Sequence, residues 1–169
     1  MKAIKYLIII VLLLTVRHSM AAPNDLNTSL NDVLKSYLGI KNALVADDYK
    51  TANTEAKKFT AALKQVQVSQ MDAKQKAVWG KYADKLRFDG EHIGESTAVA
   101  HQREHFGSLS ANMLAVVKVF HKNDIVVYLQ YCPMVRKSWL SESETIKNPY
   151  LGKTEPTCGV VKETFKVAK

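Results

Sequence analysis

The sequence predicts a mainly α-helical protein: a four-helix, up-and-down-like bundle with a small two-stranded β element and a long cysteine-containing loop near the C-terminus. Apolar residues recur at spacings of three and four through four segments between about residues 25 and 121. From residue 125 onward the chain instead becomes β-branched and aromatic. Both cysteines and three of the four prolines also fall between residues 125 and 159.

The N-terminus has the features of an export signal. Lys2 and Lys5 precede the apolar run Leu7–Val16, and Ser19-Met20-Ala21 is a small-residue cleavage pattern. The apolar run is about half the roughly twenty residues that a membrane-spanning helix needs. We therefore predict a signal peptide over residues 1–21 and a single domain over residues 22–169. The mature protein is expected in the periplasm or outside the cell, without a stable membrane anchor.

The charge of the chain gives no sign of a nucleic-acid partner. The formal net charge is +8, and Lys2, Lys5 and Arg17 leave with the predicted signal while no acidic residue does. The remaining lysines are spread over helical surfaces, with no arginine-rich or aromatic strip beside them. We therefore expect no nucleic-acid binding.

Four helices are predicted in order. The first covers Asp25–Ala46, and the second follows the Asp47-Asp48 break, which supplies an N-cap, and runs to about Val68. The third is capped by Ser69 or Asp72, and Gly90 and Gly94 favour a kink or a short turn around His92. The fourth, over Thr97–His121, places Gln102 among core residues, where its amide requires a hydrogen-bond partner.

Two strands are predicted after the helices. The first begins at Ile125 and ends near Cys132, and the second lies within Thr157–Val167. If the strands pair antiparallel, Cys132 closes one and Cys158 opens the other, so the long loop between them brings the two thiols together.

The motif Cys132-Pro133-Met134 offers two sulfur atoms on one side of the chain. A residue before proline adopts extended backbone, in which residues i and i+2 face the same way. Two thiolates and a thioether, with an imidazole nearby, are ligands that Cu(I) or Ag(I) favours, and the thioether argues against zinc. A disulfide is the alternative, because two cysteines in an exported chain commonly form one and adjacent strands provide the required spacing.

The histidines are weaker candidates on their own. His101 and His105 lie one helical turn apart, a spacing that can hold a metal ion but is more often that of two surface residues. His92 lies beside glycines and could turn inward. His121 is near a helix C-terminus, where an imidazole interacts with the helix dipole.

Several separated segments match a known family in order. They are GEHIGESTAVAHQREHFGSLSANMLAVVKVF, VYLQYCPM, WLSESETIKNPYLGK and TCG. The chain resembles a family of bacterial exported domains of unknown function, which occur as small stand-alone proteins and fused to periplasmic adaptor subunits of heavy-metal efflux pumps. The resemblance is weak over the first two predicted helices and close from about His92 to Val160.

The resemblance implies a helical bundle that bears the cysteine loop, and a link to copper or silver handling. Trp139, Asn148 and Tyr150 are expected to be structural. Family members usually have a methionine shortly before the second cysteine, whereas Lys153–Thr157 contains none. The following positions match the family pattern: His92, Gln102, Arg103, His105, Phe106, Cys132, Pro133, Met134, Trp139, Leu140, Ser141, Ile146, Asn148, Pro149, Tyr150, Gly152, Cys158 and Gly159.

Two functions follow from these observations. The first is a periplasmic protein that binds Cu(I) or Ag(I) and sequesters the ion or passes it to an efflux system. Its ligands would be Cys132, Cys158 and Met134, completed by His105 or His92. The second is a non-catalytic exported interaction module with a structural Cys132–Cys158 disulfide and no metal, whose helical face meets a partner such as an efflux-pump adaptor.

Catalysis is the least favoured class. The sequence contains no glycine-rich phosphate loop, no serine-centred nucleophile elbow and no HExxH zinc signature. We therefore predict that the chain is not an enzyme, and we assign no catalytic residue and no organic cofactor site.

Overall fold

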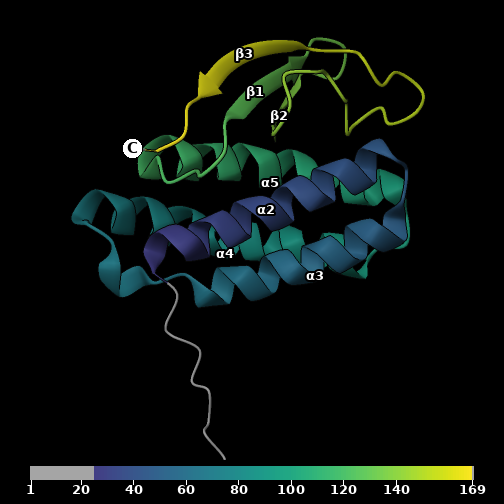
Figure 1. The fold of residues 1–169 in the computed structure, drawn as a ribbon. Helices are drawn as coiled ribbons and strands as arrows, with labels where there is room; N and C mark the ends of the chain where they lie inside the picture. The colour runs from purple at the N-terminus through teal and green to yellow at the C-terminus, as the bar shows by residue number, and fades with distance from the viewer. Residues whose placement is uncertain (1–24, 169) are drawn as a thin grey trace, which may run out of the picture.

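The computed structural model describes residues 25–168 and confirms the mainly helical fold class (Figure 1). The predicted signal peptide lies outside the described residues. The elements, in order, are α2 (Leu26–Val45), α3 (Tyr49–Gln65), the short 3-10 helix η1 (Val68–Gln70), α4 (Ala73–Glu95), α5 (Val99–Phe120), β1 (Val127–Cys132), β2 (Lys137–Ser141) and β3 (Val160–Phe165).

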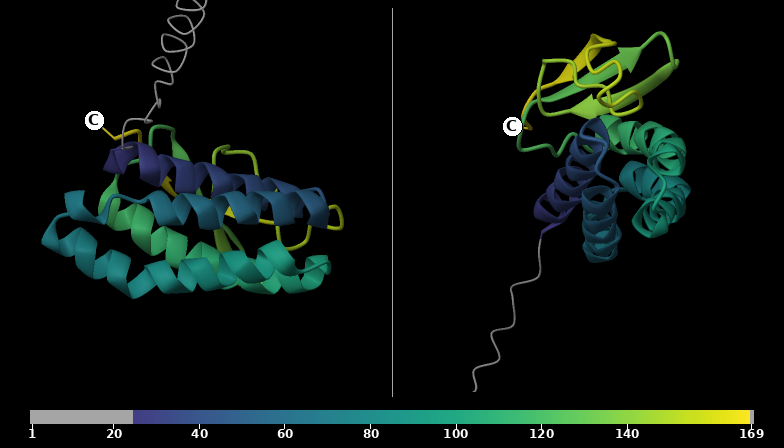
Figure 2. Two further views of the ribbon diagram at one scale, coloured as in Figure 1. Left: turned by 90° about the horizontal axis from the view of Figure 1, so that it is seen from below. Right: turned by 90° about the vertical axis from the view of Figure 1, so that its right-hand side faces the viewer.

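Successive helices pack against one another to form the bundle. Helix α2 contacts α3, α3 contacts α4 and α4 contacts α5, and α5 returns to contact α2. The sheet covers one side of this bundle, above α5 and α2, as the end-on view in Figure 2 shows. Each helix therefore buries an apolar face in one shared core, as the helical periodicity of the sequence predicts.

Three of the helices begin at aspartate N-caps. The Asp25 side chain accepts a hydrogen bond from the backbone N–H of Thr28, and the Asp48 side chain accepts one from Thr51. Asp72 forms a reciprocal capping box with Gln75 at the start of α4. Of the predicted caps, Asp48 and Asp72 are therefore the residues that the structure uses.

Helix α4 runs without interruption through His92 to Glu95, so the short turn expected near His92 does not occur there. Gly90 instead allows α4 to approach α3 closely. A Cβ atom at this position would lie 2.9 Å from Cγ2 of Thr60 and 3.0 Å from Cδ1 of Phe59. The glycine therefore serves helix packing rather than chain flexibility.

The β element has three strands, so the predicted number of two was wrong. The antiparallel order is β2-β1-β3, and the predicted strands correspond to β1 and β3. The missed strand, β2, forms a hairpin with β1 through a turn in which Arg136 has a positive φ of 53°. Its five residues begin with Lys137-Ser138, so the segment lacks the apolar run by which the other strands were found.

One tyrosine joins the sheet to the bundle. The hydroxyl of Tyr37, on α2, accepts a hydrogen bond from the backbone N–H of Leu140 on β2 at 3.0 Å. The same hydroxyl lies 2.8 Å from the Ser110 hydroxyl on α5. Burial raises the pKa of Tyr37, so the phenol stays neutral and hydrogen-bonded at this three-element junction.

Candidate functional site

The two cysteines form a disulfide at the end of the sheet where β1 ends and β3 begins. Cys132 ends β1 opposite Lys137, and β1 continues its pairing with β3 up to Tyr131 opposite Val160. This register brings Cys158, two residues before β3, to a Cα–Cα distance of 5.7 Å from Cys132. The expected proximity of the two sulfur atoms is confirmed. They are bonded to each other in a disulfide, which is the alternative to a metal site.

Met134 lies in the turn between β1 and β2 and is 67% exposed. It is two residues from the disulfide in sequence, at the same end of the sheet. The thioether is therefore close in sequence to the bridge but presented to solvent.

Asn148 holds the long loop between β2 and β3 in shape. Its side-chain oxygen accepts hydrogen bonds from the backbone N–H groups of Tyr150 and Leu151, at 2.8 and 3.2 Å. Its side-chain nitrogen donates to the carbonyl of Cys158 at 2.8 Å, and its backbone N–H donates to the carbonyl of Pro156 at 2.8 Å. The buried Asn148 therefore ties the middle of the loop to its C-terminal end, beside the disulfide.

Arg103 fastens this loop to the bundle. From α5, its guanidinium donates to the carbonyl of Pro149 at 2.8 Å and to the carbonyl of Leu44 at 2.9 Å, and it forms an ion pair with Asp47. Asp47 also accepts a hydrogen bond from the backbone N–H of Lys153. Desolvation opposes ionisation of Asp47, but the bonds from Arg103 and Lys153 outweigh it and lower the pKa of this carboxyl.

Trp139 and Tyr150 are structural, as expected. The Trp139 ring is fully buried, and its centroid lies 6.0 Å from that of Tyr150 in an edge-to-face arrangement. Tyr150 also packs on Phe106 of α5, and its hydroxyl donates to the carbonyl of Ser138 at 2.7 Å. Tyr150 therefore connects the loop to the bundle through Phe106 and to the sheet through Trp139 and Ser138.

The amide of Gln102 finds hydrogen-bond partners for its nitrogen but, among the described residues, none for its buried oxygen Oε1. Its side-chain nitrogen lies 3.0 to 3.1 Å from the carbonyl oxygens of Tyr49, Ile93 and Ser96. These carbonyls belong to the start of α3 and to the end of α4, so the amide joins α5 to both neighbouring helices.

His92 and His105 meet each other on α4 and α5. Their ring centroids are 4.5 Å apart, and His101 is 4.7 Å from His105. Their hydrogen bonds go to helix residues, from His92 to the carbonyl of Phe88 and from His105 to Asp89, whereas Cys132 is bonded to Cys158. The predicted site therefore divides into a sulfur group on the sheet and an imidazole group on the helices.

The sequence reasoning missed two neighbours of the imidazole group, Asp89 and Phe88. Asp89 is buried and hydrogen-bonds to His105 at 3.0 Å, and the Phe88 ring lies 4.1 Å from His92. The available signal was their position three and four residues before His92, on the same face of a helix.

The described residues 25–168 contain no group of three or more His, Cys, Asp or Glu side chains placed to hold a metal ion. The soft-metal site predicted from the cysteines and a histidine is thus not assembled in this state of the chain. The disulfide explains this, because thiolate is the form of cysteine that binds a metal.

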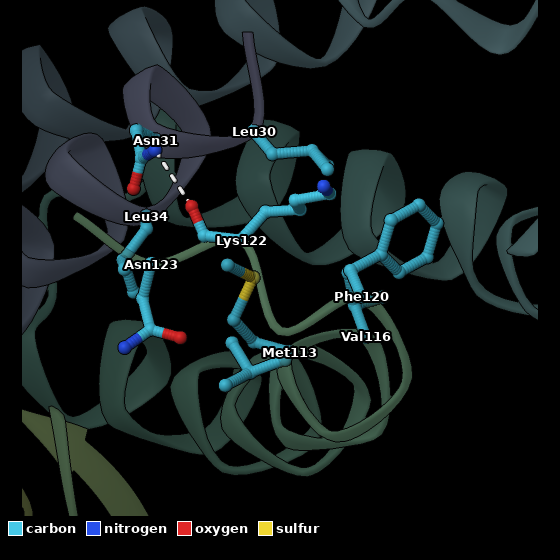
Figure 3. A pocket seen from close by; sticks show the side chains of 9 residues that line it. Leu30, Asn31, Leu34, Met113, Val116, Phe120, Lys122 and Asn123 are labelled. Atoms are coloured by element: carbon cyan, nitrogen blue, oxygen red, sulfur yellow. Dashed lines mark hydrogen bonds between the residues drawn. The ribbon is translucent and has the colours of Figure 1, made fainter. Parts of the chain in front are cut away.

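An apolar pocket between α2 and the end of α5 has no convergent reactive groups. Figure 3 shows Leu30, Leu34 and Met113 among its lining side chains. Its polar rim is occupied by Asn31, whose side chain donates to the carbonyl of Lys122 at 2.8 Å. We therefore interpret this pocket as a packing feature that secures the chain after α5.

The fold and the site together define a helical-bundle domain whose sheet carries a disulfide-closed loop. A protein-family model matches residues 33–124, from α2 to the end of α5, and the family is described as a protein of unknown function, DUF3347. Because the match covers more than half of the chain, the protein belongs to the DUF3347 family. The matched region ends before β1, so the cysteine loop lies outside it.

The other comparisons add no relative. No curated protein and no solved structure matches the chain. None of the helices in the described part of the chain is both long and apolar enough to cross a bilayer.

Proposed function

We propose that this chain is a non-catalytic, exported interaction module whose C-terminal loop is fixed by the Cys132–Cys158 disulfide. The disulfide is the observation that carries the proposal, because it occupies both thiols of the chain. Disulfides persist in oxidising compartments, which supports a location in the periplasm or outside the cell.

The roles of the family-like residues support the same proposal. The side chains of Arg103, Asn148 and Tyr150 donate hydrogen bonds to backbone carbonyls and so hold the loop in place. Their role in this proposal is structural, and none of them serves as a nucleophile or a base. At the disulfide end of the sheet, Met134 in the β1–β2 turn and residues 153–157 in the long loop remain exposed.

The proposed partner is a periplasmic adaptor subunit of a heavy-metal efflux pump. The resemblance of the sequence to domains that are fused to such adaptors is the reason for this choice. A stand-alone copy of a domain that is elsewhere fused to a protein would meet that protein through a non-covalent surface. The rigid, exposed loop end is a suitable surface, because a preorganised contact loses little conformational entropy on binding.

The test is a binding measurement between the exported protein and a purified adaptor from the same cell. We expect saturable binding that Met134→Glu weakens about tenfold or more, since a buried charge without a partner is costly. Val68→Glu is the matched control, because Val68 is exposed but lies on η1, outside the loop. Absence of binding, or equal weakening by both variants, would contradict the proposal.

A second function, soft-metal binding, rests on one observation: Met134 follows Cys132 by two residues, at the end of the sheet that carries the disulfide. If a reductant opens the disulfide, two thiols and a thioether become available close together, a set that suits Cu(I) or Ag(I). We expect the reduced protein to bind about one Cu(I) per chain, and Cys132→Ser to abolish binding. If the reduced protein binds no Cu(I), this function is wrong.

A further inference from the structure

The imidazoles on α4 and α5 form a cluster that the proposed function does not use. It consists of His92 on α4 and of His101 and His105 on α5, and we name it the histidine cluster. His105 is partly buried, with a side chain 17% exposed, while the His101 side chain is 47% exposed. The cluster is therefore accessible from solvent.

The hydrogen bonds of the cluster fix which nitrogen atom of each ring is free. Nδ1 of His92 lies 2.9 Å from the carbonyl oxygen of Phe88, which only accepts, so this nitrogen is the donor. Nδ1 of His105 lies 3.0 Å from a carboxylate oxygen of Asp89 and donates to it in the same way. In the neutral imidazoles, Nε2 therefore carries a free lone pair on both rings.

Asp89 is an unusual partner for a helix-surface histidine. Its side chain is only 6% exposed, and it accepts a hydrogen bond from Nδ1 of His105 at 3.0 Å. A carboxylate that accepts from Nδ1 while Nε2 is free is the arrangement that orients and polarises metal-binding histidines. Asp89 would thus act as a positioning residue for His105.

The spacing of the rings suits a shared ion. With metal–nitrogen bonds of roughly 2.0–2.1 Å, the centres of two imidazoles on one ion lie about 4.5–5.5 Å apart. The observed separation is 4.5 Å for His92 and His105, at the lower end of this range. Their rings are stacked with an interplanar angle of 29°, so binding an ion would require the rings to rotate until both Nε2 atoms face it. His101 lies 4.7 Å from His105. Its contact with Glu104, at 3.5 Å, is exposed to solvent and therefore weak, so the His101 ring can reorient toward an ion.

We propose that His92 and His105 form a binding site for a divalent transition-metal ion of the kind that prefers imidazole, such as Zn²⁺. The two protein ligands are their Nε2 atoms, and water and the reoriented His101 complete the coordination. As they stand, the described residues hold no preassembled three-ligand group, so the ion itself would draw His101 into place. The site requires neither cysteine and is independent of the state of the disulfide.

The test is a calorimetric titration of the exported, disulfide-intact protein with zinc chloride at neutral pH. We expect about one Zn²⁺ per chain, with affinity reduced about tenfold or more in His92→Ala and in His105→Ala. Asp89→Asn keeps the size of the side chain and an acceptor oxygen but loses the charge, and should weaken binding about 10- to 100-fold. His121→Ala is the matched control and should leave the affinity unchanged, since His121 lies at the far end of α5.

A second measurement keeps the proposal testable if a variant fails to fold. In the unaltered protein, NMR signals of the His92 and His105 rings should shift together on addition of Zn²⁺, while that of His121 should not. An absence of saturable binding would overturn the proposal. So would binding that survives in a folded His105→Ala variant, or ring signals that do not move.

Discussion

Arg103 shows how a single side chain connects parts of the chain that are far apart in sequence. It reaches from α5 to the turn after α2 and to the loop between β2 and β3. Gly152 lies close to the same ion pair with a positive φ of 54°, and a Cβ atom there would collide with the side chains of Arg103 and Asp47. The glycine and the arginine therefore form one joint between the loop and the bundle.

At this scale we predict that Arg103→Ala lowers the free energy of unfolding by about 2–4 kcal/mol, because several charge-assisted hydrogen bonds are lost together. Arg103→Lys should recover only part of the loss, since an ammonium group cannot reproduce the planar fork of donors. Urea denaturation followed by circular dichroism measures both.

Arg87→Ala is the matched control for that experiment. Arg87 also forms ion pairs, with Asp84 and Glu91, but on the surface of α4, where the three side chains are 42–90% exposed. Its removal should leave the urea midpoint nearly unchanged, because solvent screens exposed ion pairs. Equal losses from Arg87→Ala and Arg103→Ala would show that the joint has no special role.

The Cys132–Cys158 disulfide stabilises the sheet, because it links the end of β1 to the start of β3. The disulfide links residues 26 positions apart, and closing a loop of this length in the unfolded chain stabilises the fold by about 3.5 kcal/mol in the chain-entropy account. We predict a loss of this order in the Cys132→Ser, Cys158→Ser double variant. Backbone hydrogen exchange should show faster opening of β1 and β3 than of the helices. Uniform acceleration over all elements would contradict this assignment.

A second prediction concerns the contact between α2 and the residue after β2. Glu142 pairs with the buried Lys41 at 2.9 Å and accepts from Asn42. Burial raises the pKa of Glu142, but the hydrogen bonds from Asn42 and Lys41 outweigh it, so the pKa lies below the usual 4.5. The folded state then binds fewer protons than the unfolded state, and stability is lost as pH falls from about 4.5 through the folded pKa.

The measurement is the urea midpoint as a function of pH for the unaltered protein and for Glu142→Gln. The variant should be less stable at neutral pH, because Lys41 keeps a buried charge without its partner. Its midpoint should also fall less steeply on the acid side. An acid limb as steep as that of the unaltered protein would show that Glu142 does not contribute to it.

The helices and two of the strands could be predicted from the sequence because their signals are local. Asp48 and Asp72 cap helices that an apolar periodicity already marks. β2 could not be found this way, because its pairing with β1 and its contact with α5 define it more than its own five residues do. Tertiary context outweighs local preference in such a strand.

The candidate site was predicted in part for the same reason. The meeting of Cys132 and Cys158 follows from antiparallel pairing, which the sequence suggested. The histidines were expected to complete that site, but helix geometry directs His105 toward Asp89 on α4 instead. The contact of His105 with Asp89 joins two different helices, and residue spacing within one helix does not predict such a contact.

As a whole molecule, the protein is a bundle and a sheet that share one core. Tyr37, Arg103 and Lys41 each join a helix to the sheet or to its loop. We therefore predict one cooperative unfolding transition. In a Trp79→Phe variant, the fluorescence of Trp139 in β2 should change at the same urea concentration as the far-ultraviolet signal of the helices. An earlier change in fluorescence would indicate a sheet that unfolds on its own.

The central claim is that both sulfur atoms serve the fold of an interaction module. The most direct test counts free thiols in the exported protein, isolated without reductant and denatured in the presence of a thiol reagent, with the metal content of the same sample measured alongside. This account predicts no free thiol and no copper or silver held by sulfur, because Cys132 and Cys158 are bonded to each other. Two free thiols per chain, with about one equivalent of copper, would contradict it and favour the soft-metal function.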